Sequence, residues 1–218
     1  MNFNRHSEIE GTHAVLSASK YTWLRDDSEE KIIARFAASY ATAIGTSCHV
    51  FAKDVIEKNL RLAKTDKKML LLHLLKDTAK IPYAVIDYID FDTVFETVRL
   101  FANDAIGFRM TPEVPLKYSM FVYGTADAIS YNDGILRIHD LKTGRTPASI
   151  DQLLIYAADF CLEYGIDPFK LKGVELRLYQ NAEALIHNPE PNEIRAVMNQ
   201  AMFCDTTIGN FIGLEARL

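Results

Sequence analysis

Cysteine is scarce in this chain, and the three cysteines that it has stand far apart. Cys48, Cys161 and Cys204 are spread over 218 residues and are odd in number. A disulfide framework, a cysteine-based zinc site or an iron–sulfur cluster needs about four thiolates at suitable spacings. We therefore expect none of these, and we predict reduced cysteines in a cytoplasmic setting.

Long apolar runs are missing as well. Apolar residues make up 49% of the chain and charged residues 24%, which is ordinary for a folded protein with a core. No stretch approaches the roughly 18 uninterrupted apolar residues of a membrane span. The opening Met-Asn-Phe-Asn-Arg-His is not followed by the apolar segment of a secretory signal. We expect neither membrane insertion nor secretion.

The chain also lacks net positive charge, with a formal charge of −5 at pH 7. Proteins that bind nucleic acid usually carry a basic face, because neutralising phosphates dominates their affinity. The charge argues against a non-specific coat on DNA. It does not exclude an enzyme, because carboxylates that hold a divalent cation add negative charge that the cation offsets. Candidate phosphate contacts are Lys20, Arg25, Arg109, Lys117, Arg145 and Arg177.

The spacing of apolar residues predicts helices in the first half of the chain. A short helix is expected around residues 17–24, and a long helix is expected to start near Asp27. The apolar stripe of the long helix comprises Ile44, Cys48, Phe51 and Val55. Two further amphipathic helices are expected over residues 66–80 and 83–106, divided by Pro82.

Strands dominate the second half. We expect extended segments at residues 113–117, 121–131, 135–142 and 172–180. Thr146 as N-cap and Pro147 predict the start of a helix that ends at Gly165, and a weaker helix is expected over 192–203. The prediction is one α/β domain with three parts: a mainly helical lobe (1–106), a β-β-β-α-β core (107–182) and a C-terminal helical segment (183–218).

An Asn-Asp-Gly turn at residues 132–134 joins two of these strands. With a two-residue type I′ turn, Asp127 lies opposite Asp140. Their side chains would share one face, with Cβ atoms about 5 Å apart. Lys142 lies two residues beyond Asp140 and shares that face. A slip of one residue would send Asp140 to the other face, so the register tests the prediction.

Two carboxylates this close repel each other unless a positive charge neutralises them. A hard divalent cation such as Mg²⁺ prefers oxygen ligands and commonly takes one or two carboxylates with water and a substrate phosphate. Lys142 would hold the attacking water or stabilise charge on the phosphorus oxygens. Asp127, Asp140 and Lys142 are thus a candidate catalytic set for phosphodiester hydrolysis. An isolated Asp-x-Lys, by contrast, is usually a solvated strand face.

Four motifs follow one another along the chain: Gly45-Thr-Ser-Cys-His49, Gly124-Thr-Ala-Asp127, Asp140-Leu-Lys142-Thr-Gly144 and Gln152-Leu-Leu-Ile-Tyr156. They resemble the motif series of the RecB-like, phage-exonuclease-like branch of the PD-(D/E)XK nuclease superfamily. Ser17-Ala-Ser19 with Trp23 also looks like the N-terminal segment of phage and mobile-element members. The resemblance runs from about residue 15 to residue 180. It implies a restriction-endonuclease-like core, a mixed sheet flanked by helices, with a helical N-terminal lobe.

The resemblance also assigns roles to the strand residues. Asp127 and Asp140 match the metal-binding acids, with the backbone carbonyl of Leu141 as a further ligand, and Lys142 matches the catalytic lysine. The implied cofactor is Mg²⁺ or Mn²⁺, as one or two ions. Many relatives carry a four-cysteine iron–sulfur cluster, and this chain lacks those cysteines, so no such cluster is expected.

Four residues outside these two strands are further candidates. His49 matches a histidine that reaches the metal from the helical lobe, and on its own it would be taken as a surface or core histidine. Gln152 and Tyr156, one helical turn apart, match a motif that supports the site or contacts the DNA backbone. Glu113 is either a second-metal or supporting acid or a plain surface glutamate, because its flanking prolines leave its orientation open.

The function implied is a metal-dependent deoxyribonuclease in which a metal-activated water attacks phosphorus and leaves a 3′ hydroxyl and a 5′ phosphate. An exonuclease is favoured, because a helical lobe carrying His49 would wall the cleft. No phosphate-binding Gly-x-x-x-x-Gly-Lys-Ser/Thr loop is present, so we expect a standalone nuclease domain. DNA is the implied partner, with a recombinase or single-strand annealing protein beside it. The implied setting is a bacterial cell, with a phage or mobile element as the source.

Two other functions stay open. The first is a catalytically silent DNA-binding or assembly protein with the nuclease fold, although such a protein would usually have lost one of Asp127, Asp140 and Lys142. The second is a metal-dependent phosphoesterase, which would act on small nucleotides and not on polymeric DNA.

Overall fold

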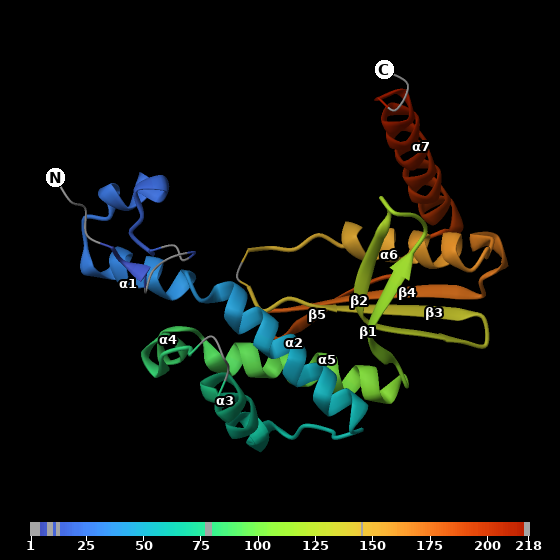
Figure 1. Cartoon of the computed structure of the whole chain (residues 1–218). Coiled ribbons are helices and arrows are strands. Elements are labelled where there is room, and N and C mark those ends of the chain that lie inside the picture. Colours follow the sequence, from blue (N-terminus) through green and yellow to red (C-terminus); the bar gives the residue numbers. More distant parts are fainter. Residues whose placement is uncertain (1–4, 8–10, 12–13, 77–79, 145, 216–218) are drawn as a thin grey trace.

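A five-stranded mixed sheet with helices on both faces is the centre of the protein, which a computed structural model describes over residues 5–7, 11, 14–76, 80–144 and 146–215 (Figure 1). The strands lie side by side in chain order: β1 (Thr111–Lys117), β2 (Tyr123–Asn132), β3 (Ile135–Leu141), β4 (Gly173–Gln180) and β5 (Glu183–His187). Neighbouring strands are antiparallel, apart from the parallel pair β3 and β4. A parallel pair needs a crossover connection, and helix α6 supplies it.

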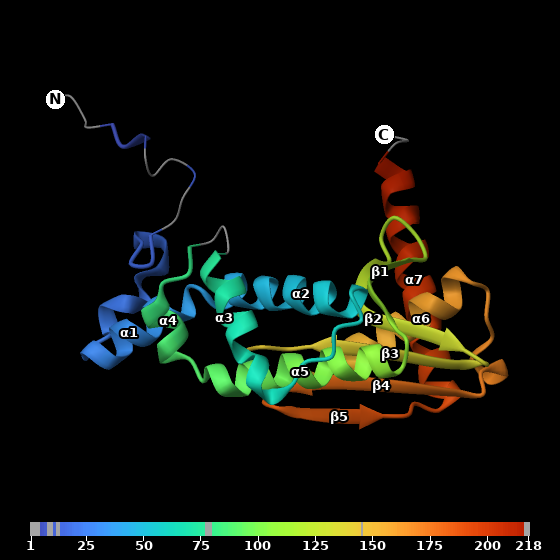
Figure 2. The same ribbon diagram turned by 90° about the horizontal axis from the view of Figure 1, so that it is seen from below.

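The described helices form one layer on each face of the sheet and a lobe at one end. Their bounds are α1 (Glu29–Ala38), α2 (Ala41–Glu57), α3 (Lys67–Lys76), α4 (Tyr83–Tyr88), α5 (Phe91–Gly107), α6 (Asp151–Glu163) and α7 (Pro191–Glu215). Short 3-10 helices are η2 (Ala18–Arg25), η3 (Lys64–Asp66) and η4 (Pro168–Lys170). Helix α5 covers one face of β3 and β4 and α6 covers the other, as both views show (Figures 1 and 2).

Two hydrophobic clusters meet at the sheet. The α2–α5 cluster joins α2, α3 and α5 to one face of the sheet through Ala128, Leu141 and Tyr179. The α6 cluster joins α6 and the first half of α7 to the opposite face through residues such as Ile138 and Leu176. Strands β2, β3 and β4 therefore each contribute side chains to both clusters, as expected for a sheet that is buried on both faces.

The hairpin between β2 and β3 has the predicted register. Its ladder runs from Asn132–Ile135 to Ala128–His139. Asp133 and Gly134 both have positive φ, at 53° and 83°, which is the backbone of a type I′ turn. The next position along each strand is Asp127 on β2 and Asp140 on β3, so the predicted opposition of the two acids follows from the observed ladder.

Several helices begin or end elsewhere than predicted. The long helix expected from Asp27 is two helices, because the chain turns at residues 39–40 between α1 and α2. The helix expected over 83–106 is also two, because Asp90 caps a new helix by accepting a hydrogen bond from the backbone N–H of Thr93 at 3.1 Å. The helix expected over 66–80 is described as α3, and residues 77–79 lie outside the described residues.

The prediction that Thr146 and Pro147 begin a helix is wrong. Gln180 holds this segment as a loop: its Nε2 donates to the carbonyls of Gly144 and Thr146, both at 2.7 Å, and its Oε1 accepts from Ala148 N at 3.2 Å. Helix α6 starts only at Asp151. Gly165, with φ of +62°, follows the end of α6, as predicted.

The C-terminal part, residues 183–218, was predicted as a helical segment with a weak helix over 192–203, and no strand was predicted in it. Residues 183–187 form β5, whose side chains are mostly exposed, so the strand gives no alternating apolar signal. Helix α7 is also longer than the predicted 192–203. Its far half rises away from the sheet (Figure 1), and its side chains Phe203 and Phe211 are exposed. In the part of the chain that the structure describes, no helix has the length and apolar character of a membrane span.

Candidate functional site

Three carboxylates occupy neighbouring positions across β1, β2 and β3. Glu113 lies opposite Asp127, because the pairs on either side are Pro112–Ala128 and Val114–Ala126. The β2–β3 ladder ends at Ala128–His139, and Asp127 and Asp140 are the next residues along the two strands. Asp127 Oδ2 accepts a hydrogen bond from Leu141 N at 2.8 Å, which ties the acid to the end of β3. The sheet thus presents a row of acids that lie near the start of β1, in the middle of β2 and near the end of β3.

The site lies where the two hydrophobic clusters meet. Ala126 belongs to the α6 cluster and Ala128 to the α2–α5 cluster, although alternate residues of a strand normally share a face. This change of face coincides with Glu113, whose φ of +53° is unusual for a residue with a side chain. Asp127 therefore stands at a break in the regular alternation, within reach of elements on both faces of the sheet.

Helix α2 brings His49 to this row from the helical side. The imidazole Nδ1 is 3.3 Å from Asp127 Oδ1 and 3.8 Å from Glu113 Oε1. Gly45, one turn earlier, faces the loop after β3, where a methyl group at position 45 would lie 3.4 Å from Thr143 Oγ1. The helix can therefore approach the loop closely at Gly45 while it directs His49 at the acids.

Burial and neighbouring charges shift the pKa values of His49, Glu113 and Asp140. Burial acts to lower the pKa of His49, but Asp127, Glu113 and Asp140 outweigh it, so the pKa of the imidazole is raised. Burial and the charge of Asp127 raise the pKa of Glu113 and also that of Asp140, where Lys142 opposes the shift. The site is thus a partly buried, negatively charged group that favours a cation.

Lys142 is the centre of a chain of hydrogen bonds that reaches helix α6. Its Nζ donates to Asp140 Oδ1 at 2.9 Å and to Gln152 Oε1 at 3.0 Å. Gln152 Nε2 donates to the hydroxyl of Tyr156 at 2.9 Å. The Tyr156 ring lies over Gly124, where an added methyl group would be 2.7 Å from ring atom Cε1. All four predicted motifs therefore contribute to one place in the fold.

The residues at this place fit a divalent cation. One ligand atom each from His49, Glu113 and Asp127 lie within 4.8 Å of one another. Asp140 is 1% exposed, and its Oδ2 accepts no hydrogen bond from the described residues, although Lys142 Nζ is 2.8 Å away. Carboxylate oxygens with one imidazole suit Mg²⁺ or Mn²⁺ better than softer metals.

Among side chains, the predicted metal ligands and the observed group differ in one residue each: Asp140 was predicted, and Glu113 is found. Glu113, which sequence reasoning left undecided, lies beside His49 and Asp127, whereas Asp140 is engaged with Lys142. The carbonyl of Leu141 lies on the Asp127 side of β3, because the N–H and C=O of a strand residue point the same way and Leu141 N bonds Asp127. Glu113 could not be placed from spacing, because its flanking prolines and its positive φ make the strand irregular at this point.

The candidate phosphate contacts do not gather at this site as a group. Arg177 donates to Asp104 at 2.8 Å and lies over the Phe108 ring, so it belongs to a network on the α5 face of the sheet. Arg109 lines a cavity beside residues 130–132 of β2. Lys117 extends from the β1–β2 hairpin, Lys20 and Arg25 belong to η2, and Arg145 lies outside the described residues.

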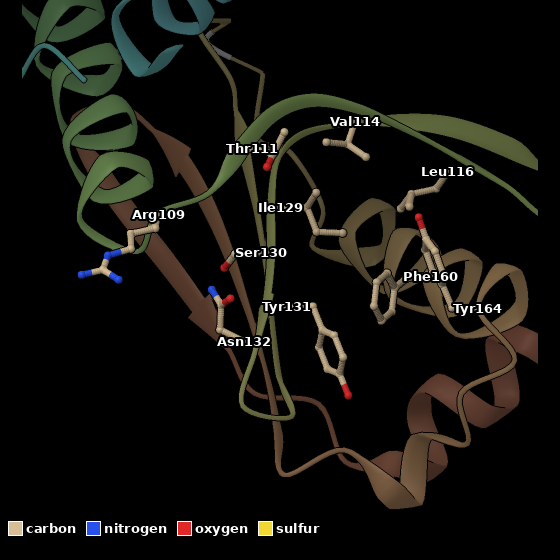
Figure 3. A pocket seen from close by; sticks show the side chains of 10 residues that line it. All are labelled: Arg109, Thr111, Val114, Leu116, Ile129, Ser130, Tyr131, Asn132, Phe160 and Tyr164. Carbon is tan, nitrogen blue, oxygen red and sulfur yellow. The ribbon is translucent and has the colours of Figure 1, made fainter. Parts of the chain in front are cut away.

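The cavity of about 340 Å³ drawn in Figure 3 is separate from the carboxylate row. The aromatic side chains of Tyr131, Phe160 and Tyr164 lie on one side of β2, and Arg109 and Ser130 lie on the other. The cavity thus lies around residues 130–132 of β2, which extend past the first residue of β1 and have no partner in that strand. None of the predicted site residues lines it, so the carboxylate row and not this cavity is the candidate site.

Gln180 is a supporting residue that sequence reasoning missed. Its three hydrogen bonds fix the loop between Lys142 and Gln152, so it determines how the lysine and the glutamine approach each other. Its partners are more than 30 positions away in the sequence, and a glutamine at the end of a strand carries no local signal of such a role.

A family model described as "Protein of unknown function (DUF2800)" matches residues 13–188. Because the match covers most of the chain, the protein belongs to this family. The matched range contains the whole carboxylate row, His49, Lys142 and the α6 residues, whereas α7 lies beyond it. No curated protein and no solved structure matches the chain.

Proposed function

We propose that this protein is a divalent-metal-dependent deoxyribonuclease with a restriction-endonuclease-like core, of the PD-(D/E)XK type. One observation carries the proposal: Lys142 Nζ bonds both Asp140 and Gln152 directly beside the group of His49, Glu113 and Asp127. The order β-β-β-α-β that positions these residues was predicted from the sequence pattern, and it supports the proposal.

Each residue has a definable task in hydrolysis. His49, Glu113, Asp127 and Asp140 would hold the cation, which supplies positive charge to the phosphate and acidity to water when bound. Lys142 has three N–H donors and gives two of them to Asp140 and Gln152, which leaves one for a water or a phosphate oxygen. Gln152 and Tyr156 fix the direction of that remaining donor, and this positioning contributes to catalysis without a covalent step.

We further propose that the enzyme is an exonuclease. Helix α2 packs against β1, so the helical lobe walls the acids on the His49 side. Helix α6 carries Gln152 and Tyr156 on the other side of the row. A site enclosed from two sides admits a strand end more readily than the middle of a duplex.

The test is degradation of end-labelled linear DNA and closed circular DNA, each single- and double-stranded, with Mg²⁺ or Mn²⁺. We expect loss of the linear substrates, survival of the circles and inhibition by EDTA. Lys142→Ala should reduce the rate by about a hundredfold or more, because it removes the charge and the donor next to the reacting phosphate. Lys172→Ala, just before β4 and beside the turn of the β2–β3 hairpin, is the matched control.

Other results would select another function. Cleavage that persists in EDTA contradicts the metal-dependent mechanism, and rapid cutting of circles contradicts the exonuclease. If wild type and Lys142→Ala are equally inactive on every polymer but still bind DNA, the protein is a silent DNA-binding or assembly protein. Cleavage of mononucleotides alone would indicate a small-substrate phosphoesterase.

A further inference from the structure

The hairpin between β1 and β2 exposes large flat and apolar side chains that contribute to neither core. Tyr118 is 36% exposed, Met120 71%, Phe121 47% and Tyr123 69%. The hairpin packs against α6 through β1, and its tip lies on the α6 and α7 side of the sheet (Figure 1). Clustered exposed apolar groups of this size mark interaction surfaces more often than scattered single ones.

The tip of this hairpin is an ordered turn. Tyr118 N and Ser119 N donate to the carbonyl of Val122 at 3.0 and 3.1 Å. The Ser119 hydroxyl accepts from Phe121 N at 3.0 Å and from Val122 N at 3.1 Å. The backbone that carries the exposed rings is therefore held in place before any partner arrives, which lowers the entropy cost of binding.

One face of the hairpin runs from the tip to the carboxylate row. Leu116 and Ala126 are buried against α6, so the alternate positions Lys117, Tyr123 and Thr125 face outward. Tyr123 is four residues before Asp127 on the same strand, a distance of about 13 Å. At roughly 3.4 Å per stacked nucleotide, this path matches about four nucleotides of one strand.

The charge of this face suits a polyanion. Between Glu113 and Asp127 the sequence has no carboxylate, and Lys117 is its single charged residue. The whole chain, by contrast, has a net charge of −5. The carboxylate nearest to this segment in the hydrogen-bond network is Glu163 of α6, whose Oε2 accepts from Lys117 N at 2.9 Å. An aromatic surface whose own strands carry no acid between Glu113 and Asp127, continuous with a cation-binding row, is the combination that unpaired nucleotides recognise, because every base has a face that stacks on a ring.

We propose that the outward face of the β1–β2 hairpin binds unpaired nucleotides by stacking on Phe121 and Tyr123, and leads a single strand toward the carboxylate row. This assignment rests on the proposed nuclease function for the identity of its ligand. A blunt duplex offers few base faces, so the hairpin distinguishes single strands from duplexes.

The experiment measures binding of a fluorescein-labelled single-stranded DNA oligonucleotide and of a blunt duplex to the full chain with Mg²⁺. Lys142→Ala is the background throughout, so that the probe is not consumed. Phe121→Ala and Tyr123→Ala are each expected to weaken single-strand binding about tenfold. Tyr123→Leu keeps the apolar area without the flat ring and should weaken it as much. Phe203→Ala, equally exposed on α7, is the matched control and should change it less than about twofold.

The results separate the hairpin from the active site. If wild type degrades DNA but the hairpin variants bind single strands as tightly as their background, the hairpin assignment alone is overturned. If single strands bind through the hairpin and the wild type cleaves nothing, the nuclease alone is overturned. A change in oligomeric mass upon Tyr123→Ala, with no change in DNA binding, would show that the surface serves self-association and would also overturn the assignment.

Discussion

Gly124 shows how a residue without a side chain can determine the position of a functional group. The Tyr156 ring occupies the space that a Cβ at position 124 would need, and its hydroxyl accepts from Gln152. Gln152 in turn accepts from Lys142. The Gly-x-x-Asp motif therefore contributes more than its acid, because its glycine admits the ring that supports the lysine.

We predict that Gly124→Ala lowers the cleavage rate about ten- to a hundredfold, because a small displacement of a positioning group is costly to catalysis. The unfolding free energy should fall by roughly 1–3 kcal/mol, as expected for an overpacked site. Gly173→Ala in β4 is the matched control, since a Cβ there meets nothing within 4 Å. An unchanged rate for Gly124→Ala would contradict the positioning role of Tyr156.

Asp159 on α6 is an acid outside the carboxylate row whose buried environment disfavours the charged form. It is 1% exposed, and its Oδ1 has no hydrogen-bond partner among the described residues. Burial, with a smaller contribution from Glu163, raises the pKa of this carboxyl to about 6. The folded state therefore holds the proton more tightly than the unfolded state, and the stability that this provides is lost as the pH rises toward the folded pKa.

Asp159→Asn should consequently stabilise the protein by roughly 2 kcal/mol at about pH 8, because the amide is never charged. The gain should shrink as the pH is lowered below about 6 and nearly vanish near the unfolded pKa of about 4. Urea denaturation across this range measures it, with exposed Glu183→Gln as the control. A gain that does not depend on pH would contradict the assigned titration.

At the scale of elements, the loop between β3 and α6 connects the two ends of the lysine's hydrogen-bond chain. Lys142 precedes the loop, Gln152 follows it, and Gln180 of β4 bonds it at three backbone atoms. Its described residues, 143–144 and 146–150, form no helix or strand. Its conformation therefore depends on a side chain from the neighbouring strand.

Gln180→Ala should loosen this loop without unfolding the sheet. We expect a loss of roughly 1–3 kcal/mol in stability, from backbone groups left without partners. Amide hydrogen exchange should accelerate in residues 146–150 and stay slow in β3 and β4. The cleavage rate should fall together with the faster exchange. Slow exchange in 146–150 of the variant would show that other contacts hold the loop.

The same elements show what a sequence can and cannot predict. The β2–β3 register followed from two adjacent turn residues, because a two-residue turn is a local structure that fixes all later pairs. The start of α6 was missed, because Thr146 and Pro147 form a good local helix start that the distant Gln180 overrides. Strand β5 was missed because its side chains are exposed and carry no apolar alternation. Glu113 could not be placed, because nothing local indicates its positive φ.

At the scale of the whole molecule, the site joins the two hydrophobic clusters. His49 belongs to a helix of the α2–α5 cluster, and Lys142 is connected through Gln152 to the helix of the α6 cluster. The acids stand between them on β1, β2 and β3. A ligand held by this row therefore contacts parts of both cores at once and stabilises them together.

We predict that Mn²⁺ at about a hundred times its dissociation constant stabilises the folded protein by about 2.7 kcal/mol. For a chain of this size the melting temperature should rise by about 5–10 °C. Asp127→Asn should abolish most of the rise, whereas Asp92→Asn on exposed α5 surface should preserve it. Differential scanning calorimetry measures both, and no activity is needed. An equal rise in Asp127→Asn would place the metal elsewhere.

The order in which the chain is synthesised gives the position of Lys142 a further consequence. Its backbone N–H donates to the carbonyl of Tyr179 at 2.8 Å, and its ammonium needs Gln152 from a helix made after it. The ribosome must therefore synthesise β4 before these hydrogen bonds can fix Lys142. By then His49 and Asp127 have long since been synthesised. If the protein is the nuclease proposed above, its lysine is therefore not positioned for catalysis until β4 and α6 have both been made.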